Sequence, residues 1–222
     1  MTRMSHSIAC RPDDVHLVVH LVHSVGTGGL QTLLAECIDR LSTAKYRHAI
    51  ICLTERADQG AIIPGAGTTL HELHKPPGND ISTHLTLWKL LRQLRPSILH
   101  TYNVGTIEYS VTALLAGVPV RIHAEHGRDS IEIDGKHGRY NLLRRLLAPA
   151  IDAYVPVSAD LRDWLHGKVN IPRRKIAMVT NGVDTARYAP SREPCISQAT
   201  VWIGTVGRVS PIKNHLGLLD MF

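Results

Sequence analysis

Apolar runs of strand length alternate with segments of helical spacing along most of the chain. Runs such as VHLVVHLVH (15–23) are typical of buried strands, whereas GLQTLLAECIDRL (29–41) repeats its apolar residues every three or four positions. The pattern predicts strands at 15–23, 46–53, 68–73, 97–103, 119–127, 152–158 and 174–182. It predicts helices between them, at 29–41, 80–96, 106–117, 138–150 and 159–167.

This alternation predicts an α/β fold. Strands separated by helices form βαβ units with right-handed crossovers, so we expect a Rossmann-like parallel sheet with helices on both faces. In such sheets, ligands bind at the carboxyl ends of the strands. Functional side chains are therefore expected in the loops that follow the strands.

The alternation breaks at residues 185–199, TARYAPSREPCISQA, which hold two prolines and little apolar periodicity. We interpret this segment as a linker. A strand at 200–208 and the beginning of a helix at 213–222 follow it. We therefore expect an N-terminal domain at 1–184 and, at 200–222, the incomplete opening of a second domain.

The composition narrows the classes of partner. The chain of 222 residues has a formal net charge of +6, and aromatic residues make up only 5% of it. The basic excess fits a phosphate-bearing partner or an anionic membrane surface, and the few aromatic rings argue against nucleic acid. The cysteines are scattered and residues 1–14 lack the apolar stretch of a signal peptide, which favours a cytoplasmic location.

The loop after the first predicted strand, Gly26-Thr27-Gly28-Gly29-Leu30-Gln31, has the composition of a phosphate cradle. Its glycines allow a close approach to the backbone, and the helix beginning near Gly29 directs free N–H groups at it. Gln31 stands where a dinucleotide fingerprint needs its third glycine, which counts against NAD. No Gly-Lys-Ser/Thr follows, which excludes a P-loop. A bound diphosphate and a tight turn without a ligand are both compatible with this loop.

Further motifs follow in a fixed order: ILHTYN (98–103), HAEHG (123–127), VPVSAD (155–160), TNGVDTARYAP (180–190) and GTVGRVSPIKNH (204–215). In this order the chain resembles the retaining glycosyltransferases of family 4, which have the GT-B fold. NGVD followed by GR…KN is the most specific pair. The likeness is greatest to bacterial sugar transferases of exopolysaccharide loci, including those associated with PEP-CTERM systems.

The resemblance implies two Rossmann-like domains facing a cleft, with the N-terminal domain holding the acceptor. It assigns Arg208 and Lys213, together with Gly28 and Gly29, to the diphosphate of a nucleotide sugar, which is the co-substrate. Cations there stabilise the charge that develops on the leaving nucleotide. No cofactor and no metal are expected, since relatives mostly work without a metal and the sequence has no DxD motif.

The resemblance also implies a catalytic histidine. His126, in EHG, maps to a family histidine near the transferred sugar. His123 lies an odd number of residues away, which places it on the opposite face of an ideal strand, and we expect it to be structural. The histidines of the first strand, His16, His20 and His23, are likewise expected to be core or edge residues rather than metal ligands.

The expected acceptor is a glycan or a lipid-linked sugar. Gln31 replaces the glutamate that many relatives carry, and its amide can still bind an acceptor. Tyr102 and Asn103 follow the carboxyl end of a strand, and Arg128 begins a basic segment that includes Arg139, Arg144 and Arg145. That segment is either a solvated face or a contact surface for a lipid-diphosphate acceptor or the anionic inner face of the plasma membrane.

One family element is missing. The E-x7-E region, which positions the donor ribose and sugar, lies far into the second domain and so beyond Phe222. We therefore expect little activity from this chain alone. The alternatives are a non-catalytic or split half-enzyme, which binds an acceptor or a partner chain supplying the missing donor domain, and an NAD-dependent Rossmann enzyme.

Overall fold

The computed structural model describes residues 15–26, 28–41, 43–55, 67–78, 80–127, 138–189, 203–207, 209 and 213–221. The chain divides into two compact units, Met1–Asn181 and Gly182–Phe222. The first unit contains the sheet and the helices that position the candidate site. The predicted domain limits and the linker at 185–199 stay predictions.

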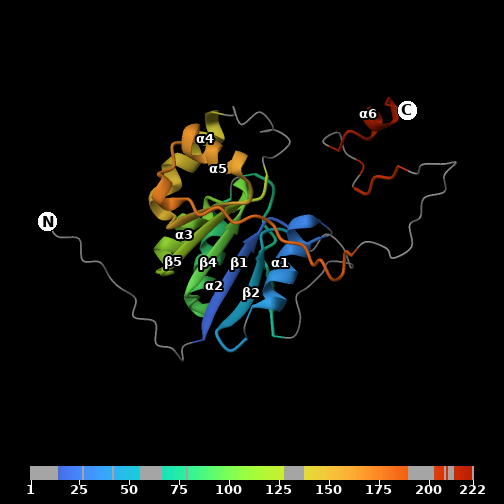
Figure 1. Cartoon of the computed structure of the whole chain (residues 1–222). Coiled ribbons are helices and arrows are strands. Elements are labelled where there is room, and N and C mark those ends of the chain that lie inside the picture. The colour runs from blue at the N-terminus through green and yellow to red at the C-terminus, as the bar shows by residue number, and fades with distance from the viewer. Residues whose placement is uncertain are drawn as a thin grey trace. The chain divides into compact units, whose positions relative to one another are not determined.

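A parallel six-stranded sheet forms the centre of the first unit, with the strand order β3-β2-β1-β4-β5-β6. Figure 1 shows β2, β1, β4 and β5 side by side in this sheet. Within this order, β1 pairs with β2 on one side and with β4 on the other, so the direction of chain progression reverses between β1 and β4. The strands are β1 (His16–Val22), β2 (Tyr46–Cys52), β3 (Thr69–Glu72), β4 (Ile98–Tyr102), β5 (Val120–Glu125) and β6 (Ala153–Pro156).

Helices cover both faces of this sheet, which confirms the predicted fold class. Alternate residues of the strands face opposite layers. Helix α1 packs on the face that includes Val22 and Ile50, whereas α2 and α3 pack on the face that includes Val19 and Leu21. A third core lies among α4, α5 and β6. These helices are α1 (Gly29–Arg40), α2 (Ile81–Leu94), α3 (Tyr109–Ala116), α4 (Gly138–Leu147) and α5 (Ala159–Gly167), with short 3-10 turns η1 (Val104–Thr106), η3 (Ala148–Ala150) and η4 (Arg173–Lys175).

Local signals fix the helix ends. Helix α2 begins after Asp80, whose carboxylate accepts hydrogen bonds from the backbone N–H groups of Ser82 and Thr83, the usual role of an aspartate N-cap. Helix α3 ends at Gly117, which has a φ of 81° and so lies in the left-handed region that glycine tolerates. The predicted helices at 80–96 and 106–117 are thus confirmed, with the second shortened by η1.

The predicted seventh strand, 174–182, does not form as a strand. Only Ile176 bridges to Tyr154 in β6, although the N–H groups of Ala177 and Val179 donate to the carbonyls of Tyr154 and Pro156. Proline has no N–H group, so Pro156 cannot return the hydrogen bond that would complete the ladder. The segment therefore runs beside β6 with only half of its expected hydrogen bonds.

The second unit is described only in part. Helix α6 (His215–Leu219) lies within the predicted helix at 213–222. Residues 203–207, inside the predicted strand at 200–208, have no regular secondary structure and are exposed. The strand prediction is wrong for these residues. A strand needs a hydrogen-bonded neighbour, and none is described in this unit.

Candidate functional site

A pocket of about 400 Å³ opens at the carboxyl ends of β1 and β4, where the strand order reverses. In open parallel sheets this position is the usual ligand site, because the loops leaving the two strands run to opposite faces. The pocket brings together three of the predicted acceptor residues and the predicted catalytic histidine. Its lining includes His23, Leu30, Gln31, Tyr102, Asn103 and His126.

The N-terminus of α1 borders this pocket. Helix α1 begins at Gly29 after the extended residue Gly28, and no side chain caps it. Its positive dipole end is therefore available to a ligand. A Cβ atom on Gly29 would meet no atom within 4 Å, so the fold does not require glycine there.

Gly28 is more constrained than Gly29. A Cβ atom at Gly28 would lie 2.6 Å from Oε1 of Gln31. The Gln31 amide is held from its other end, because its Nε2 donates to the carbonyl oxygen of Ser24 at 3.2 Å. Glycine at position 28 therefore gives room for a fixed orientation of the Gln31 side chain at the pocket wall.

Asn103 connects the ends of two strands across the pocket. Its Oδ1 accepts a hydrogen bond of 2.8 Å from the backbone N–H of His126, and its own backbone N–H donates to Ala124. Asn103 has a φ of 58° and a ψ of 173°, a backbone conformation that is essentially confined to glycine, so the chain is strained at this residue. Asn103 thus sets the position of the backbone that carries His126.

His126 is partly buried at the pocket wall. Its ring centroid lies 5.6 Å from that of Tyr102. Burial lowers the pKa of His126; the neighbouring Glu125 carboxylate acts in the opposite direction, and His123 adds to the lowering. His126 is therefore neutral near pH 7 and presents one hydrogen-bond donor and one acceptor.

The chain matches the model of Glycosyltransferase Family 4 over residues 27–187, which is more than half of its length. The chain belongs to glycosyltransferase family 4. This match confirms the resemblance drawn from the sequence motifs; it covers β4 and β5 and begins after β1.

Individual relatives agree with the family. A protein of Bacillus subtilis named as the glycosyltransferase EpsF is 24% identical over an alignment of 220 residues that covers 92% of this chain and 57% of that protein. An Escherichia coli UDP-Gal:alpha-D-GlcNAc-diphosphoundecaprenol alpha-1,3-galactosyltransferase is 27% identical over an alignment of 153 residues that covers 62% of this chain and 38% of the relative. This chain spans about half the length of the curated relatives it matches.

Solved structures show the same fold. HepE of Anabaena, crystallised with UDP, superposes on this chain with a TM-score of 0.62 at 12% identity. The match covers 79% of this chain and 46% of HepE. The first unit therefore has the architecture of one Rossmann-like half of a GT-B glycosyltransferase.

Tyr102, predicted to bind the acceptor, directs its hydroxyl into the core rather than toward the pocket. The hydroxyl is hydrogen-bonded to Nδ1 of His20 at 2.8 Å and to Nδ1 of His100 at 2.9 Å, and His20 Nε2 bonds Nδ1 of His48 at 3.1 Å. We call these four residues the histidine–tyrosine cluster. His20 is thus a core residue, as predicted. Burial lowers the pKa of His20, of His48 and of His100, in the last case to about 3.

A second buried cluster, which the sequence did not predict, lies behind His126. Glu125 is fully buried and accepts a hydrogen bond of 2.6 Å from Nε of Arg144 on α4 and one of 3.2 Å from Nε2 of His123. Burial alone raises the pKa of Glu125, but the hydrogen bond and charge of His123 and the Arg144 guanidinium outweigh it, so the pKa lies below its usual value. We call these three residues the ion cluster.

The ion cluster corrects the interpretation of the basic segment. Arg144 was predicted on a solvated or membrane-facing surface, but it is completely buried, and its guanidinium lies 4.7 Å from the Trp164 ring centroid. Arg139 and Arg145 are exposed as expected. The one sequence signal for the cluster was the Glu125 carboxylate inside the predicted strand at 119–127, because a carboxylate that is buried in a sheet needs a cation as partner.

The remaining predicted residues lie elsewhere. Arg128 and Arg208 are outside the described residues. Lys213 is exposed in the second unit, and its side-chain carbons would lie 3.8 Å from a Cβ atom on Gly207. Their assignment to the acceptor and the donor diphosphate stays a prediction. Across the described residues, no group of three His, Cys, Asp or Glu side chains is placed to hold a metal ion.

Proposed function

We propose that this chain supplies the acceptor-side domain of a longer glycosyltransferase, of the length of its relatives. That enzyme transfers a sugar from a nucleotide-diphosphate sugar to a glycan or lipid-linked acceptor, with retention of configuration. Polysaccharide synthesis, including the PEP-CTERM-associated type, and a cytoplasmic location belong to the same proposal. The observation that carries it is the pocket at the switch point, where the free N-terminus of α1 and neutral His126 line one cavity.

The chemistry of sugar transfer fits these groups. Bond cleavage leaves negative charge on the nucleotide diphosphate, and the backbone N–H groups at Gly28 and Gly29 would stabilise it without a side-chain charge. Arg208 and Lys213 would add cations from the second domain. His126, held through Asn103 and neutral near pH 7, can hydrogen-bond a hydroxyl of the transferred sugar. The acceptor proton would go to the donor phosphate.

A nucleotide-release assay tests this function. A form of the protein extended through the donor domain, and its His126→Ala and Gly29→Ala variants, would each be given a panel of UDP-, GDP- and ADP-sugars together with a lipid-diphosphate sugar acceptor. We expect His126→Ala to lower the rate at least about 100-fold, the scale of a lost transition-state contact. His166→Ala, an exposed histidine on α5, is the matched control and should leave the rate unchanged.

Gly29→Ala separates a phosphate cradle from a simple turn. No atom obstructs a methyl group at Gly29, and alanine favours a helix, so stability should hold or rise slightly. A diphosphate seated on the backbone would meet that methyl group, so release of nucleotide should fall. A variant with full activity would contradict the role assigned to Gly29.

A half-enzyme without catalysis is the second candidate, because the chain spans 57% and 38% of two curated relatives. It would bind the acceptor or a partner chain but release no nucleotide by itself. Turnover of a donor by the isolated chain would rule it out. Activity that returns only when a chain carrying the donor domain is added would support it.

A further inference from the structure

Several large apolar side chains are exposed on the outer surface of α2 and α3. Ile81, Leu85 and Trp88 recur at helical spacing along α2 and are 78%, 57% and 39% exposed. On α3, Leu115 is 72% exposed and Leu114 is also exposed. We call these five residues the α2–α3 ridge.

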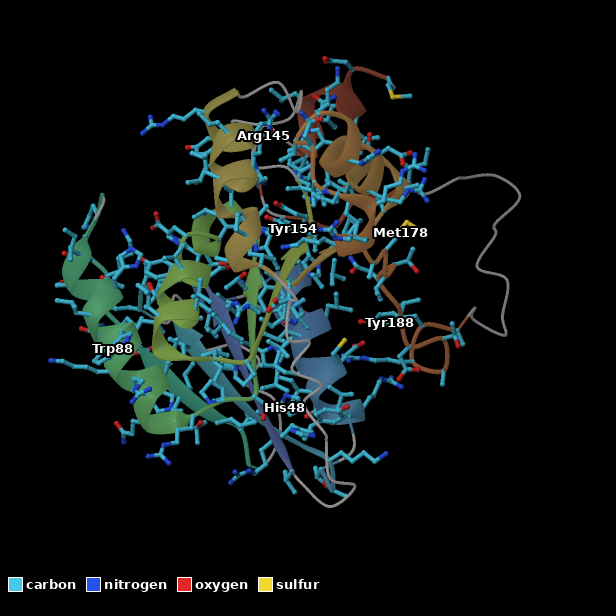
Figure 2. The ribbon with its side chains drawn as sticks, turned by 90° about the vertical axis from the view of Figure 1, so that its left-hand side faces the viewer. His48, Trp88, Arg145, Tyr154, Met178 and Tyr188 are labelled. Atoms are coloured by element: carbon cyan, nitrogen blue, oxygen red, sulfur yellow. The ribbon has the colours of Figure 1, made fainter. Side chains whose placement is uncertain are left out.

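The ridge is one continuous surface. Helices α2 and α3 pack side by side on the same face of the sheet, and both contribute to the core beneath. The indole Nε1 of Trp88 donates to the backbone carbonyl of Leu115 at 3.4 Å, which joins the exposed residues of the two helices. Figure 2 shows Trp88 on α2, the helix on the far side of the sheet from α1. Contiguous exposed apolar surface of this kind marks a contact site.

The charges beside the ridge select its partner. Helix α2 contains no acidic residue, and Lys89, Arg92 and Arg95 lie exposed at and beyond its C-terminal half. None of these three cations pairs with an acidic side chain among the described residues. Asp80 and Glu108 lie at the N-terminal ends of the two helices, and Asp80 is occupied as a cap. Glu55 and Glu72 line a pocket together with Lys89 on one flank of α2.

We infer that the α2–α3 ridge docks the protein on an anionic lipid bilayer. Leucine, isoleucine and tryptophan side chains enter the boundary between headgroups and acyl chains, and nearby lysine and arginine attract anionic lipids. A second copy of the chain is a poorer fit, because a two-fold contact through this patch would bring the same unpaired cations of both copies into one interface.

The position of the ridge suits the proposed function, on which this part of the inference rests. Helix α2 connects β3 to the parallel strand β4, so it runs antiparallel to the strands and begins at their carboxyl edge. Ile81 therefore lies at the same edge of the sheet as the pocket. Docking through the ridge would hold the pocket close to the bilayer surface, where the diphosphate of a lipid-linked acceptor lies.

Cosedimentation with vesicles tests the inference. The 222-residue chain would be mixed with vesicles of phosphatidylcholine alone and of phosphatidylcholine with phosphatidylglycerol. We expect binding to the anionic vesicles that weakens as salt is added. Leu85→Ser with Leu115→Ser should lower the partition coefficient about 10-fold or more, because two apolar side chains no longer enter the bilayer. Arg92→Gln with Arg95→Gln should lower it on the order of 10-fold and remove the preference for phosphatidylglycerol.

The control is the corresponding pair on α4, Leu142→Ser with Leu146→Ser. These leucines are about as exposed as those of the ridge and stand beside Arg139 and Arg145. Binding that survives the α4 change but not the ridge change supports the inference, with circular dichroism confirming that each variant is folded. The inference is overturned if binding is lost only with the α4 pair. It is also overturned if the chain self-associates without lipid and the ridge substitutions abolish this self-association.

The two proposals fail separately. Nucleotide release is measured without vesicles, and vesicle binding is measured without a sugar donor. Nucleotide release by the form extended through the donor domain, without binding of the 222-residue chain to anionic vesicles, overturns the docking surface and leaves the transferase proposal standing. Within the described residues, no helix is both long enough and apolar enough to cross a bilayer.

Discussion

The histidine–tyrosine cluster and the ion cluster lie on opposite faces of the sheet beside the same pocket, and they accommodate buried polar groups differently. Tyr102 and Thr101 are neighbours in β4, so their side chains point to opposite faces of the sheet. Tyr102 points toward the α1 face. Thr101 points toward the other face, where it is hydrogen-bonded to His123. The first cluster has histidines that burial keeps neutral, whereas Glu125 stays charged because it is paired.

This difference determines how each cluster responds to change. A buried ion pair depends on both of its partners, since either charge is costly when it is left alone. Neutral histidines depend on pH, because the unfolded chain takes up protons that the folded cluster rejects. The ion cluster should therefore be sensitive to single substitutions, and the histidine–tyrosine cluster should be sensitive to mild acid.

The largest effect is expected from breaking the ion cluster. Arg144→Met would leave the Glu125 carboxylate buried beside His123 without its cation. The free energy of unfolding should fall by about 3–5 kcal/mol. Urea unfolding followed by tryptophan fluorescence would measure it, because Trp164 lies against the Arg144 guanidinium.

Two further variants make this test specific. Glu125→Gln combined with Arg144→Met removes both charges and should recover most of the loss. Arg139→Met, on the exposed side of α4, should change stability very little. If Arg144→Met costs no more than Arg139→Met, the contrast between the two clusters is wrong.

The second effect is the acid sensitivity of the histidine–tyrosine cluster. The folded-state pKa values of His20 and His100 lie below the ordinary value of 6.5, that of His100 at about 3. The unfolded chain therefore binds more protons than the folded chain once the pH drops below 6.5. Each such histidine should cost about 1.4 kcal/mol of stability per pH unit below that point, until its own folded pKa is reached.

His100→Leu removes one titrating histidine from the cluster, so it measures the contribution of His100 to this acid sensitivity. Tyr102 keeps its hydrogen bond to His20 in this variant, and Nε2 of His100, which is buried without a partner, is removed. The plot of unfolding free energy against pH should become shallower between pH 6 and pH 5 by about 1.4 kcal/mol per pH unit. Glu125 loses its stabilising contribution only near and below the ordinary Glu pKa of 4.5, so its titration does not set the slope in this window. An unchanged slope would show that His100 titrates normally.

The sequence predicted the residues of the pocket better than it predicted what surrounds them. Tyr102 and Asn103 were assigned from their places at a strand end, and Gln31 and His126 from the family resemblance. A parallel sheet gathers the loops after its strands along one edge. The burial of Arg144 could not be read from its helix, because its partner Glu125 lies on a strand 19 residues earlier and pairs only after folding. Sequence periodicity carries no information about such a contact.

Two other differences have local causes that the sequence did contain. Pro156 interrupts the hydrogen-bond ladder that the predicted strand at 174–182 needed. A proline within a strand pattern indicates an edge strand, because it cannot donate a hydrogen bond to a second neighbouring strand. Tyr102 was predicted to bind the acceptor from its position at a strand end, but its hydroxyl is hydrogen-bonded to the buried side chains of His20 and His100. Histidines on neighbouring strands at matching register, such as His20 opposite His100, were the available signal.

The smallest effect concerns Asn103, which connects β4 to β5. Strand β4 carries Tyr102 of the histidine–tyrosine cluster, and β5 carries Glu125 of the ion cluster. Asn103→Gly loses the hydrogen bond to the His126 N–H, which costs about 1 kcal/mol, but it removes the backbone strain at a φ of 58° and a ψ of 173°, so it should be at least as stable as the wild type. Asn103→Ala loses the same bond and keeps the strain, so it should be about 1–3 kcal/mol less stable than Asn103→Gly. Asn103→Asp keeps an acceptor and the same backbone conformation, and should lie near the wild type. Chemical denaturation of the three variants at pH 7 would rank them. Equal costs for Gly and Ala would mean that the backbone at Asn103 is unstrained, and the position of His126 would then depend on the side-chain hydrogen bond alone.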